Sequence, residues 1–239
     1  MKSWTRTLNL DDAHTLLALA ERGTNQRAWT DACHDALPEL SVARRRELVR
    51  LLREGFLEWD DDDAIADGLF MRVYDRAPAS GQIDLVAVQW ALSHPITLVA
   101  IDDLVVPALD RDDTDIPLGD VEDLVSRELE TDSAESLRKT RTVLLGALEG
   151  IGTLETRGTG QHRTLRAHRG APHPAAFGYL VLRDLQERQL DGMMAAEVSD
   201  TSLGARLTQC GAAHADRCLR WCVANGLLEL ADDEVRAAI

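Results

Sequence analysis

Residues 133–169 read SAESLRKTRTVLLGALEGIGTLETRGTGQHRTLRAHR, and this stretch decides which fold the sequence predicts. Its first half has the pattern of a capped helix, because the hydroxyl of Ser133 or Ser136 can accept a backbone N–H that the first helical turn leaves unpaired. A buried stripe near the helical period is formed by Leu137, Val143 or Leu144, and Leu148. Gly150 and Gly152 are expected to end this helix.

Two short segments of alternating polarity follow the predicted helix. Residues 153–156 and 162–165 alternate with period two across a turn that contains Gly158 and Gly160, as the strands of a small hairpin do. A capped helix followed by such a hairpin is the sequence outline of half a winged helix-turn-helix unit. We therefore expect a mainly all-α, multi-helical fold with winged-helix-like units and one or more small β-hairpins.

Positive charge is concentrated in the same stretch. From Arg138 to Arg183 there are eight arginines and lysines but only two acids, which gives this segment a net charge of +6. The whole chain carries −15, so the remainder carries −21. A positive segment in so acidic a chain is complementary to a phosphate backbone. The alternative is that these cations pair with the acidic remainder of the chain.

The expected partner is double-stranded DNA, held through its phosphates and without base readout. The candidate contacts lie in the basic helix and the hairpin and are Arg138, Lys139, Arg141, Arg157, His162, Arg163, Arg166 and Arg169. The overall acidity is weak evidence against DNA if the host is salt-loving. At about 1 M salt the Debye length falls to about 3 Å, which screens long-range repulsion.

Length and composition set the class of protein. A chain of 239 residues with 45% hydrophobic side chains can bury a full core, and two or three small helical subdomains fit it better than one large sheet. No run approaches the roughly 20 apolar residues of a membrane span. The N-terminus lacks the apolar segment of a signal peptide, so we expect a cytoplasmic protein with no membrane partner.

A helix that ends at glycine recurs three times along the chain. The copies read RELVRLLREGFLE, VLLGALEGIGTLE and CLRWCVANGLLE, and they end at Glu58, Glu155 and Glu229. In each copy the glycine is expected to take the left-handed position after the helix, and the leucine that follows is expected to close the end as an apolar contact. This similarity favours repeated helical units more than three DNA-reading helices.

The acidic stretch 110–119 is the best candidate linker, since it combines aspartates with Pro117 and Gly119. The predicted division is an N-terminal helical domain over 1–110, a winged helix-turn-helix-like unit with a basic wing over 120–170, and a C-terminal helical unit over 171–239.

In the first of these, Asp11 or Asp12 is expected to cap the first helix and Ser41 the third, with Val42 turned inward. Further helices are expected at about 64–77, 83–93 and 95–108, and the helix before the basic one is expected to start at Asp120.

Ordinary catalytic patterns are absent from the sequence. It has no phosphate loop, no Gly-x-Ser-x-Gly elbow and no His-Glu-x-x-His motif. His94 has no carboxylate or nucleophile patterned beside it and is expected to be a capping or core residue, and the adjacent Asp102 and Asp103 are expected to be solvated. The sequence therefore predicts a protein that is not an enzyme, with no cofactor and no small-molecule substrate.

Four potential metal ligands form a regularly spaced ladder near the C-terminal end of the sequence. It consists of Cys210, His214, Cys218 and Cys222, which are each four residues apart. On one helix these side chains would extend over about 18 Å, so they cannot converge on a single ion. We expect them to be small, half-buried core residues, and we predict no metal site.

Residues 133–155, SAESLRKTRTVLLGALEGIGTLE, resemble a segment of BrxA proteins of bacteriophage exclusion (BREX) systems, in which a serine-rich cap precedes basic residues, an apolar helix and a Gly-x-Leu end. The likeness extends loosely to chain length and helical layout. It departs from the family where Thr131 and Asp132 replace the tryptophan expected before the cap. The resemblance implies a small, helical, cytoplasmic DNA-binding protein of phage defence, with Arg138, Lys139 and Arg141 as DNA contacts and other defence proteins as further partners.

Two other functions remain open at the level of sequence. One is an acidic helical adaptor that binds protein partners within a defence complex, and the other is a winged-helix transcriptional regulator.

Overall fold

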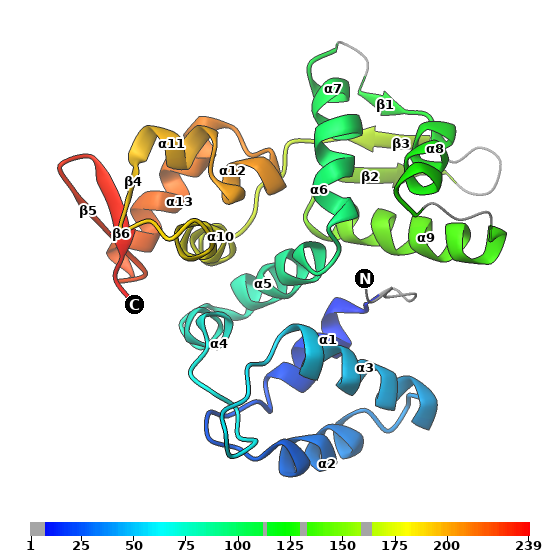
Figure 1. The fold of residues 1–239 in the computed structure, drawn as a ribbon, viewed down its shortest axis with the longest axis vertical. Coiled ribbons are helices and arrows are strands. Elements are labelled where there is room, and N and C mark those ends of the chain that lie inside the picture. Colours follow the sequence, from blue (N-terminus) through cyan, green and yellow to red (C-terminus); the bar gives the residue numbers. More distant parts are fainter. Residues whose placement is uncertain (1–7, 112–113, 130–132, 159–163) are drawn as a thin grey trace.

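The computed structural model describes residues 8–111, 114–129, 133–158 and 164–239. Helices make up 61% and strands 11% of it, which confirms the mainly helical class. The elements form three groups arranged around a central helix, α5 (Ala79–Leu92), with the N-terminal group at one end of the long axis (Figure 1).

The N-terminal group contains three helices, which are α1 (Leu10–Leu17), α2 (Gln26–Ala36) and α3 (Val42–Gly55). Each is capped by a side chain that accepts a first-turn backbone N–H, and the caps are Asn9, Asn25 and Ser41. The predicted cap at Asp11 or Asp12 is wrong, because both aspartates lie inside the first turn of α1. There their charge is favourable toward the positive end of the helix dipole.

The middle group begins with a continuous helical run and continues through a small sheet. Its helical elements are α6 (Ile96–Ala100), the π-helical turn η1 (Ile101–Val105), α7 (Val106–Leu109), α8 (Leu118–Leu129) and α9 (Ala134–Gly150). Its strands are β1 (Asp115–Ile116), β2 (Leu154–Arg157) and β3 (Thr164–Ala167), which pair antiparallel in the order β1-β3-β2.

The C-terminal group repeats this plan. Its helices are α10 (Pro174–Glu187), α11 (Ala195–Asp200), α12 (Leu203–Thr208) and α13 (Ala212–Ala224). Its strands are β4 (Met193–Met194), β5 (Leu228–Ala231) and β6 (Glu234–Ala237), paired antiparallel in the order β4-β6-β5.

The middle and C-terminal groups therefore share one chain order: helix, strand, one or two helices, a long helix, and two strands. In both sheets the third strand lies between the first and the second. The N-terminal group follows the same order in reduced form, since its strand positions are single bridges, Asn25 with Ala64 and Trp59 with Ile65. The three similar helices seen in the sequence, α3, α9 and α13, are the helices that precede the last two strand positions of the three groups.

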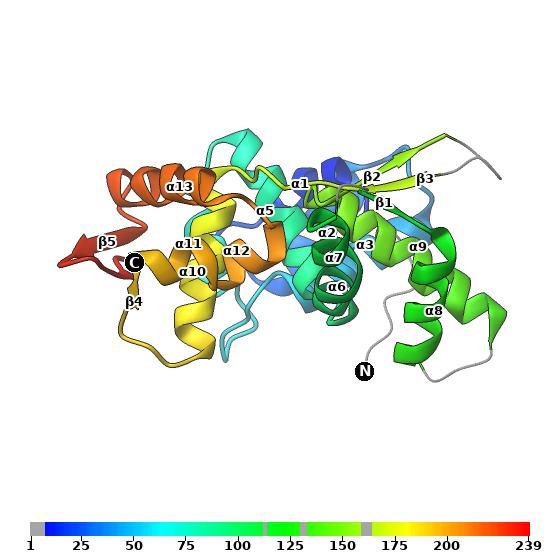
Figure 2. The same cartoon turned by 90° about the horizontal axis from the view of Figure 1, so that it is seen from above.

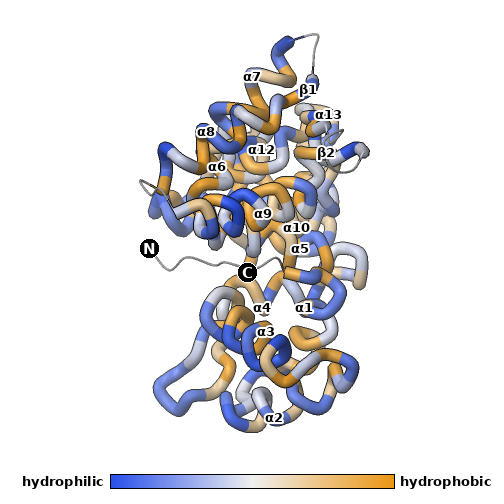
Figure 3. The backbone as a smooth tube through the Cα atoms, turned by 90° about the vertical axis from the view of Figure 1, so that its right-hand side faces the viewer, coloured by the Kyte–Doolittle hydropathy of each residue, from blue (hydrophilic) through white to orange (hydrophobic). Residues whose placement is uncertain are grey.

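The central helix α5 joins the groups, because it packs against α1, α9 and α10. At its contact with α9 a Cβ added to Gly150 would lie 3.6 Å from Ala87 Cβ, so the two helices approach closely. Apolar segments of α5, α9 and α10 lie together near the middle of the molecule, whereas the turns around α2 are largely hydrophilic (Figure 3). The chain connects α5 to the N-terminal group through the short helix α4 (Leu69–Tyr74).

Within the described parts of the chain no single helix has the length and apolar composition of a membrane span. The helices Ala79–Leu92 and Ile96–Leu109 reach that composition only as a pair bent by 92°.

The glycine-ended helices follow the prediction in two cases of three. Gly152 and Gly226 have φ of +75° and +66°, and the N–H of the residue after each bonds to a carbonyl five residues back, at 3.0 and 2.9 Å. Gly55 is the last residue of α3 and lacks a positive φ, so the left-handed position predicted for it is wrong. Phe56 is the C-cap of α3, and its buried ring packs edge-on against Phe70 at 5.5 Å.

Three further predictions need correction. Val42 is 51% exposed and does not face the core. The helix predicted over 64–77 is only α4, because Ala64 and Ile65 take part in the bridges. The helix before α9 starts at Leu118, two residues before Asp120, and the predicted hairpin gains a third strand, β1.

His94 is a core histidine at the junction between α5 and α6, as predicted. Its side chain is 8% exposed, its Nδ1 lies 2.8 Å from Trp90 O, and its ring packs edge-on against the Trp90 indole at 4.3 Å. Burial lowers the pKa of His94 below its ordinary value, and the hydrogen bond to Trp90 opposes this only in part.

This burial predicts a pH-dependent stability. Because the pKa of His94 is lower in the folded protein, the unfolded chain binds more protons below about pH 6.5. The free energy of unfolding is therefore expected to fall between about pH 7.5 and about pH 5.5, as measured by urea denaturation. His94→Gln should flatten this slope without abolishing it, since burial also lowers the pKa of His173. An unchanged slope in the variant would contradict the assignment.

Candidate nucleic-acid interface

The basic stretch forms α9, and its local signals act as predicted. Ser133 is the N-cap, and its hydroxyl accepts the backbone N–H of Ser136 at 3.4 Å. The buried side of the helix carries Val143, Leu144 and Leu148. Figures 1 and 2 both place α8, the first turns of α9 and the outer ends of β2 and β3 at the same end of the molecule. The candidate residues of helix and hairpin are therefore brought to one end of the middle group.

Two of the three candidate cations on α9 are already paired with carboxylates. Lys139 Nζ lies 2.5 Å from Glu135 Oε1, one turn earlier on the same helix, and this pairing lowers the pKa of Glu135. Arg141 pairs with Glu122 of α8 and so links the two helices. Arg138 is exposed and takes part in no ion pair among the described residues.

A shallow groove of about 230 Å³ lies between α8 and α9 near these cations. Its lining combines apolar side chains with three charged ones and consists of Glu122, Val125, Ala134, Leu137, Arg138 and Arg141. Both arginines of α9 thus line a hollow beside the first turns of the helix, and the helix dipole favours negative charge at this end.

The sheet beside α9 has a mixed charge, which the sequence of the hairpin alone did not indicate. In the register of β3 with its neighbours, Arg166 stands opposite Glu155 of β2 on one side and Asp115 of β1 on the other. Arg166 Nε also donates to Thr114 Oγ1 at 2.8 Å. Arg166 is therefore charge-compensated and half-buried, and it is a weaker candidate for a phosphate contact than its sequence context suggested.

Glu155 pairs with two further side chains, Arg157 of β2 and His168 directly after β3. Its Oε2 lies 2.9 Å from Arg157 Nη2 and 2.9 Å from His168 Nε2. The pairing, first with Arg157 and then with His168, lowers the pKa of Glu155, so this carboxyl stays ionised at neutral pH. The guanidinium of Arg157 remains 54% exposed, which leaves it accessible at the end of β2.

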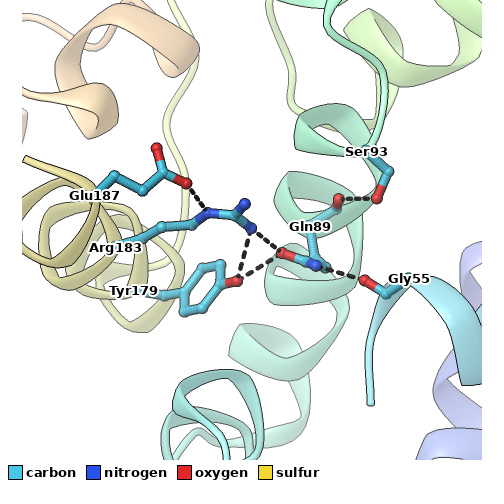
Figure 4. A network of polar contacts seen from close by, with 6 residues as sticks. All are labelled: Gly55, Gln89, Ser93, Tyr179, Arg183 and Glu187. Carbon is cyan, nitrogen blue, oxygen red and sulfur yellow. Dashed lines mark hydrogen bonds and ion pairs between the residues drawn. The ribbon is translucent and has the colours of Figure 1, made fainter. Parts of the chain in front are cut away.

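The other candidates are distributed differently. Arg169 is exposed and takes part in no ion pair among the described residues. His162 and Arg163 lie outside the described residues. Arg183 also belongs to the positive segment of the sequence, but it lies in α10, away from the sheet. Its side chain takes part in a polar network with Gln89 of α5 (Figure 4).

That network was missed by sequence reasoning, because its members are far apart along the chain. Gln89 Nε2 donates to Gly55 O at 2.5 Å, and Gln89 Oε1 accepts the hydroxyl of Tyr179 at 2.5 Å and Arg183 Nη1 at 3.0 Å. Arg183 Nε also donates to Glu187 at 2.6 Å (Figure 4). The network lies beside a cleft of about 340 Å³ between α3, α5 and α10, and it joins the N-terminal and C-terminal groups.

The two adjacent aspartates and the cysteine ladder singled out in the sequence lie in ion pairs and in the core. Asp102 pairs with Arg206 at 2.8 Å, and Asp103 pairs with Arg127, so both predicted surface aspartates lie in exposed ion pairs. The cysteines of the ladder, Cys210, Cys218 and Cys222, lie in the core as predicted, but they are buried and not half-buried. Burial raises the pKa of Cys218 and Cys222 to about 12, which keeps these thiols protonated. Among the described residues no group of three or more histidine, cysteine or acidic side chains could hold a metal ion.

No protein-family model matches the chain, and no curated protein or solved structure matches it either.

Proposed function

We propose that this protein binds double-stranded DNA without catalysing a reaction, through winged-helix-like units of which the middle one carries the contact. The observation that carries the proposal is the repeated order of helix, strand, helices and two strands, with the third strand central in both complete sheets. In helix-turn-helix proteins the second helix of the pair lies against the duplex. In the middle group this helix is α9, and the hairpin β2–β3 follows it directly.

The arginines of α3 in the N-terminal group are followed by the acidic run 60–63, whereas no acid follows α9 between residues 156 and 173, so charge favours the middle group. Its long helix begins with Arg138, Lys139 and Arg141, and Arg157 and Arg169 follow in and after the hairpin. Cations of this kind bind phosphates, and each phosphate contact contributes about 0.9 to the slope of log affinity against log salt. We propose contacts to the phosphate backbone alone, without base readout.

The proposed setting is a cytoplasmic phage-defence system of the BREX kind. It rests on the resemblance of residues 133–155 to BrxA proteins. Other proteins of the same system are then proposed as further partners.

One observation favours a second candidate, an acidic adaptor that binds proteins. Lys139, Arg141 and Arg157 are paired with carboxylates, and the chain as a whole carries −15. If these pairs persist beside DNA, the surface offers little net charge to phosphate.

Arg138→Ala tests the DNA-binding proposal. Arg138 is exposed and outside the ion pairs, so its removal should leave the fold intact and weaken binding of a short duplex about tenfold at about 0.1 M salt. The salt slope should fall by about 1, and the loss should be the same for duplexes of different sequence. Fluorescence anisotropy over a salt series measures all three quantities.

The matched control is Arg220→Ala. Arg220 lies on α13, the corresponding helix of the C-terminal group, is 67% exposed, and takes part only in an exposed ion pair with Asp216 at 2.8 Å, whose loss costs little stability. This variant has the same change in net charge and should bind as the parent does. Equal binding by the parent and by a variant that lacks Arg138, Lys139, Arg141 and Arg157 would refute the proposal. Co-purification with defence proteins in the absence of any duplex binding would favour the adaptor.

A further inference from the structure

We propose that Glu122, Glu135 and Glu155 hold the cations of the middle group in place of phosphate, so that DNA binds by an exchange of ion pairs. This inference rests on the proposed function, and it specifies how the affinity of the same surface is set. The three carboxylates come from three different elements, α8, α9 and β2, and each is paired with a candidate DNA contact.

The pair between Arg141 and Glu122 crosses from α9 to α8. Glu122 is 52% exposed and Arg141 is 28% exposed, and both line the groove between the two helices. The carboxylate of Glu122 therefore lies where an anion that entered the groove would meet Arg141. A phosphate can reach this arginine fully only after Glu122 has turned away.

In the pair between Lys139 and Glu135 a carboxylate again holds a candidate cation, and both residues belong to α9. Glu135 lies in the first turn of α9 and is 68% exposed. The start of a helix favours negative charge, because its first N–H groups have no intrahelical partner. Glu135 thus occupies the end of α9 that would otherwise be most favourable to a phosphate.

Glu155 serves the hairpin in the same way. It is 42% exposed and holds Arg157 and His168 at 2.9 Å each. Arg166 stands opposite it in the sheet. Glu155 therefore holds Arg157, and Arg157 has to leave this carboxylate to contact DNA.

Exposed ion pairs of this kind contribute little to the stability of a protein, so a strand of phosphates can displace them. Displacement frees counterions from the DNA, but it also returns carboxylates to solvent, where they gather cations again. The net number of ions released is then smaller than the number of phosphate contacts. An exchange of ion pairs therefore predicts a moderate affinity for the duplex and a shallow dependence of that affinity on salt.

The experiment compares two triple variants with the parent protein in duplex binding. The test variant is Glu122→Gln, Glu135→Gln and Glu155→Gln, which keeps side-chain size and frees three cations. The control variant changes three exposed acids that take part in no ion pair among the described residues, Glu21→Gln, Glu39→Gln and Glu149→Gln. Both variants gain the same net charge, so a difference between them reports the released cations.

The test variant should bind a short duplex about tenfold more tightly than the control variant at about 0.1 M salt, with a salt slope steeper by at least about 1. Thermal unfolding of both variants checks that the fold persists, and Glu155→Gln alone should give a smaller gain in the same direction. If the two triple variants bind equally while Arg138→Ala still weakens the parent, the exchange is wrong and the proposed function stands. If neither the parent nor any variant binds duplex, the proposed function fails and the exchange fails with it.

Discussion

Gly170→Ala is expected to lower the free energy of unfolding by about 3 kcal/mol. A Cβ at this position would lie 2.5 Å from Thr208 O and 3.0 Å from Ile151 O. Both are backbone atoms, so no side chain can rotate to make room. The N–H of Gly170 also donates to Thr208 O at 2.8 Å, and any shift that relieves the clash strains this bond.

Gly170 has this effect because the chain passes there from the middle group to the C-terminal group. It lies between β3 and α10, and its two close neighbours belong to the middle group and the C-terminal group. Urea denaturation gives the midpoint and slope from which the loss of free energy is read.

Gly119→Ala is the matched control, since a Cβ there meets nothing within 4 Å in the first turn of α8. That variant should be neutral or slightly stabilised, because alanine favours helix more than glycine does. A Gly170→Ala protein with an unchanged midpoint would show that the groups pack less closely than described.

The second large effect is expected for Gln89→Leu, with a loss of about 3 kcal/mol. Leucine has a similar volume but cannot replace the bonds to Gly55 O, the hydroxyl of Tyr179 and the guanidinium of Arg183. Tyr179 is 3% exposed, so its hydroxyl would lose the acceptor of its proton away from water and keep only the bond that it accepts from Arg183 Nη1 at 3.3 Å. An unsatisfied buried polar group costs more than a hydrogen bond contributes when made.

Tyr179→Phe provides the control, because it removes the hydroxyl and leaves the ring and the other bonds of Gln89 in place. It should cost about 1 kcal/mol. In the double variant the orphaned hydroxyl is absent, so the combined loss should be smaller than the sum of the single losses. A double-mutant cycle from urea denaturation measures this coupling. Strict additivity would mean that the two side chains do not share a bond.

Features determined by neighbouring residues could be predicted from the sequence. Ser133 caps α9, and Gly152 and Gly226 take left-handed conformations, because a hydroxyl or a missing Cβ acts within one turn of helix. The core position of Cys218 and Cys222 followed from their spacing on one helix face.

Features set by distant partners could not be predicted. Gln89 has no local signal, since its partners Gly55 and Tyr179 are 34 and 90 residues away along the chain. The two residues of β1 are too few to show a pattern, yet they place Asp115 beside Arg166. The candidate interface was therefore recognised as a positive segment, while the pair of Arg141 with Glu122 became visible only through the packing of α8 on α9.

The position of α5 distinguishes this protein from a string of separable modules. One helix supplies part of the core to all three groups, so each group is incomplete without a neighbour's surface. In a linear array of repeats, units can be lost or duplicated while the rest stays folded. Here excision of any one group would strip an apolar face from α5, which couples the unfolding of the three groups into one cooperative event.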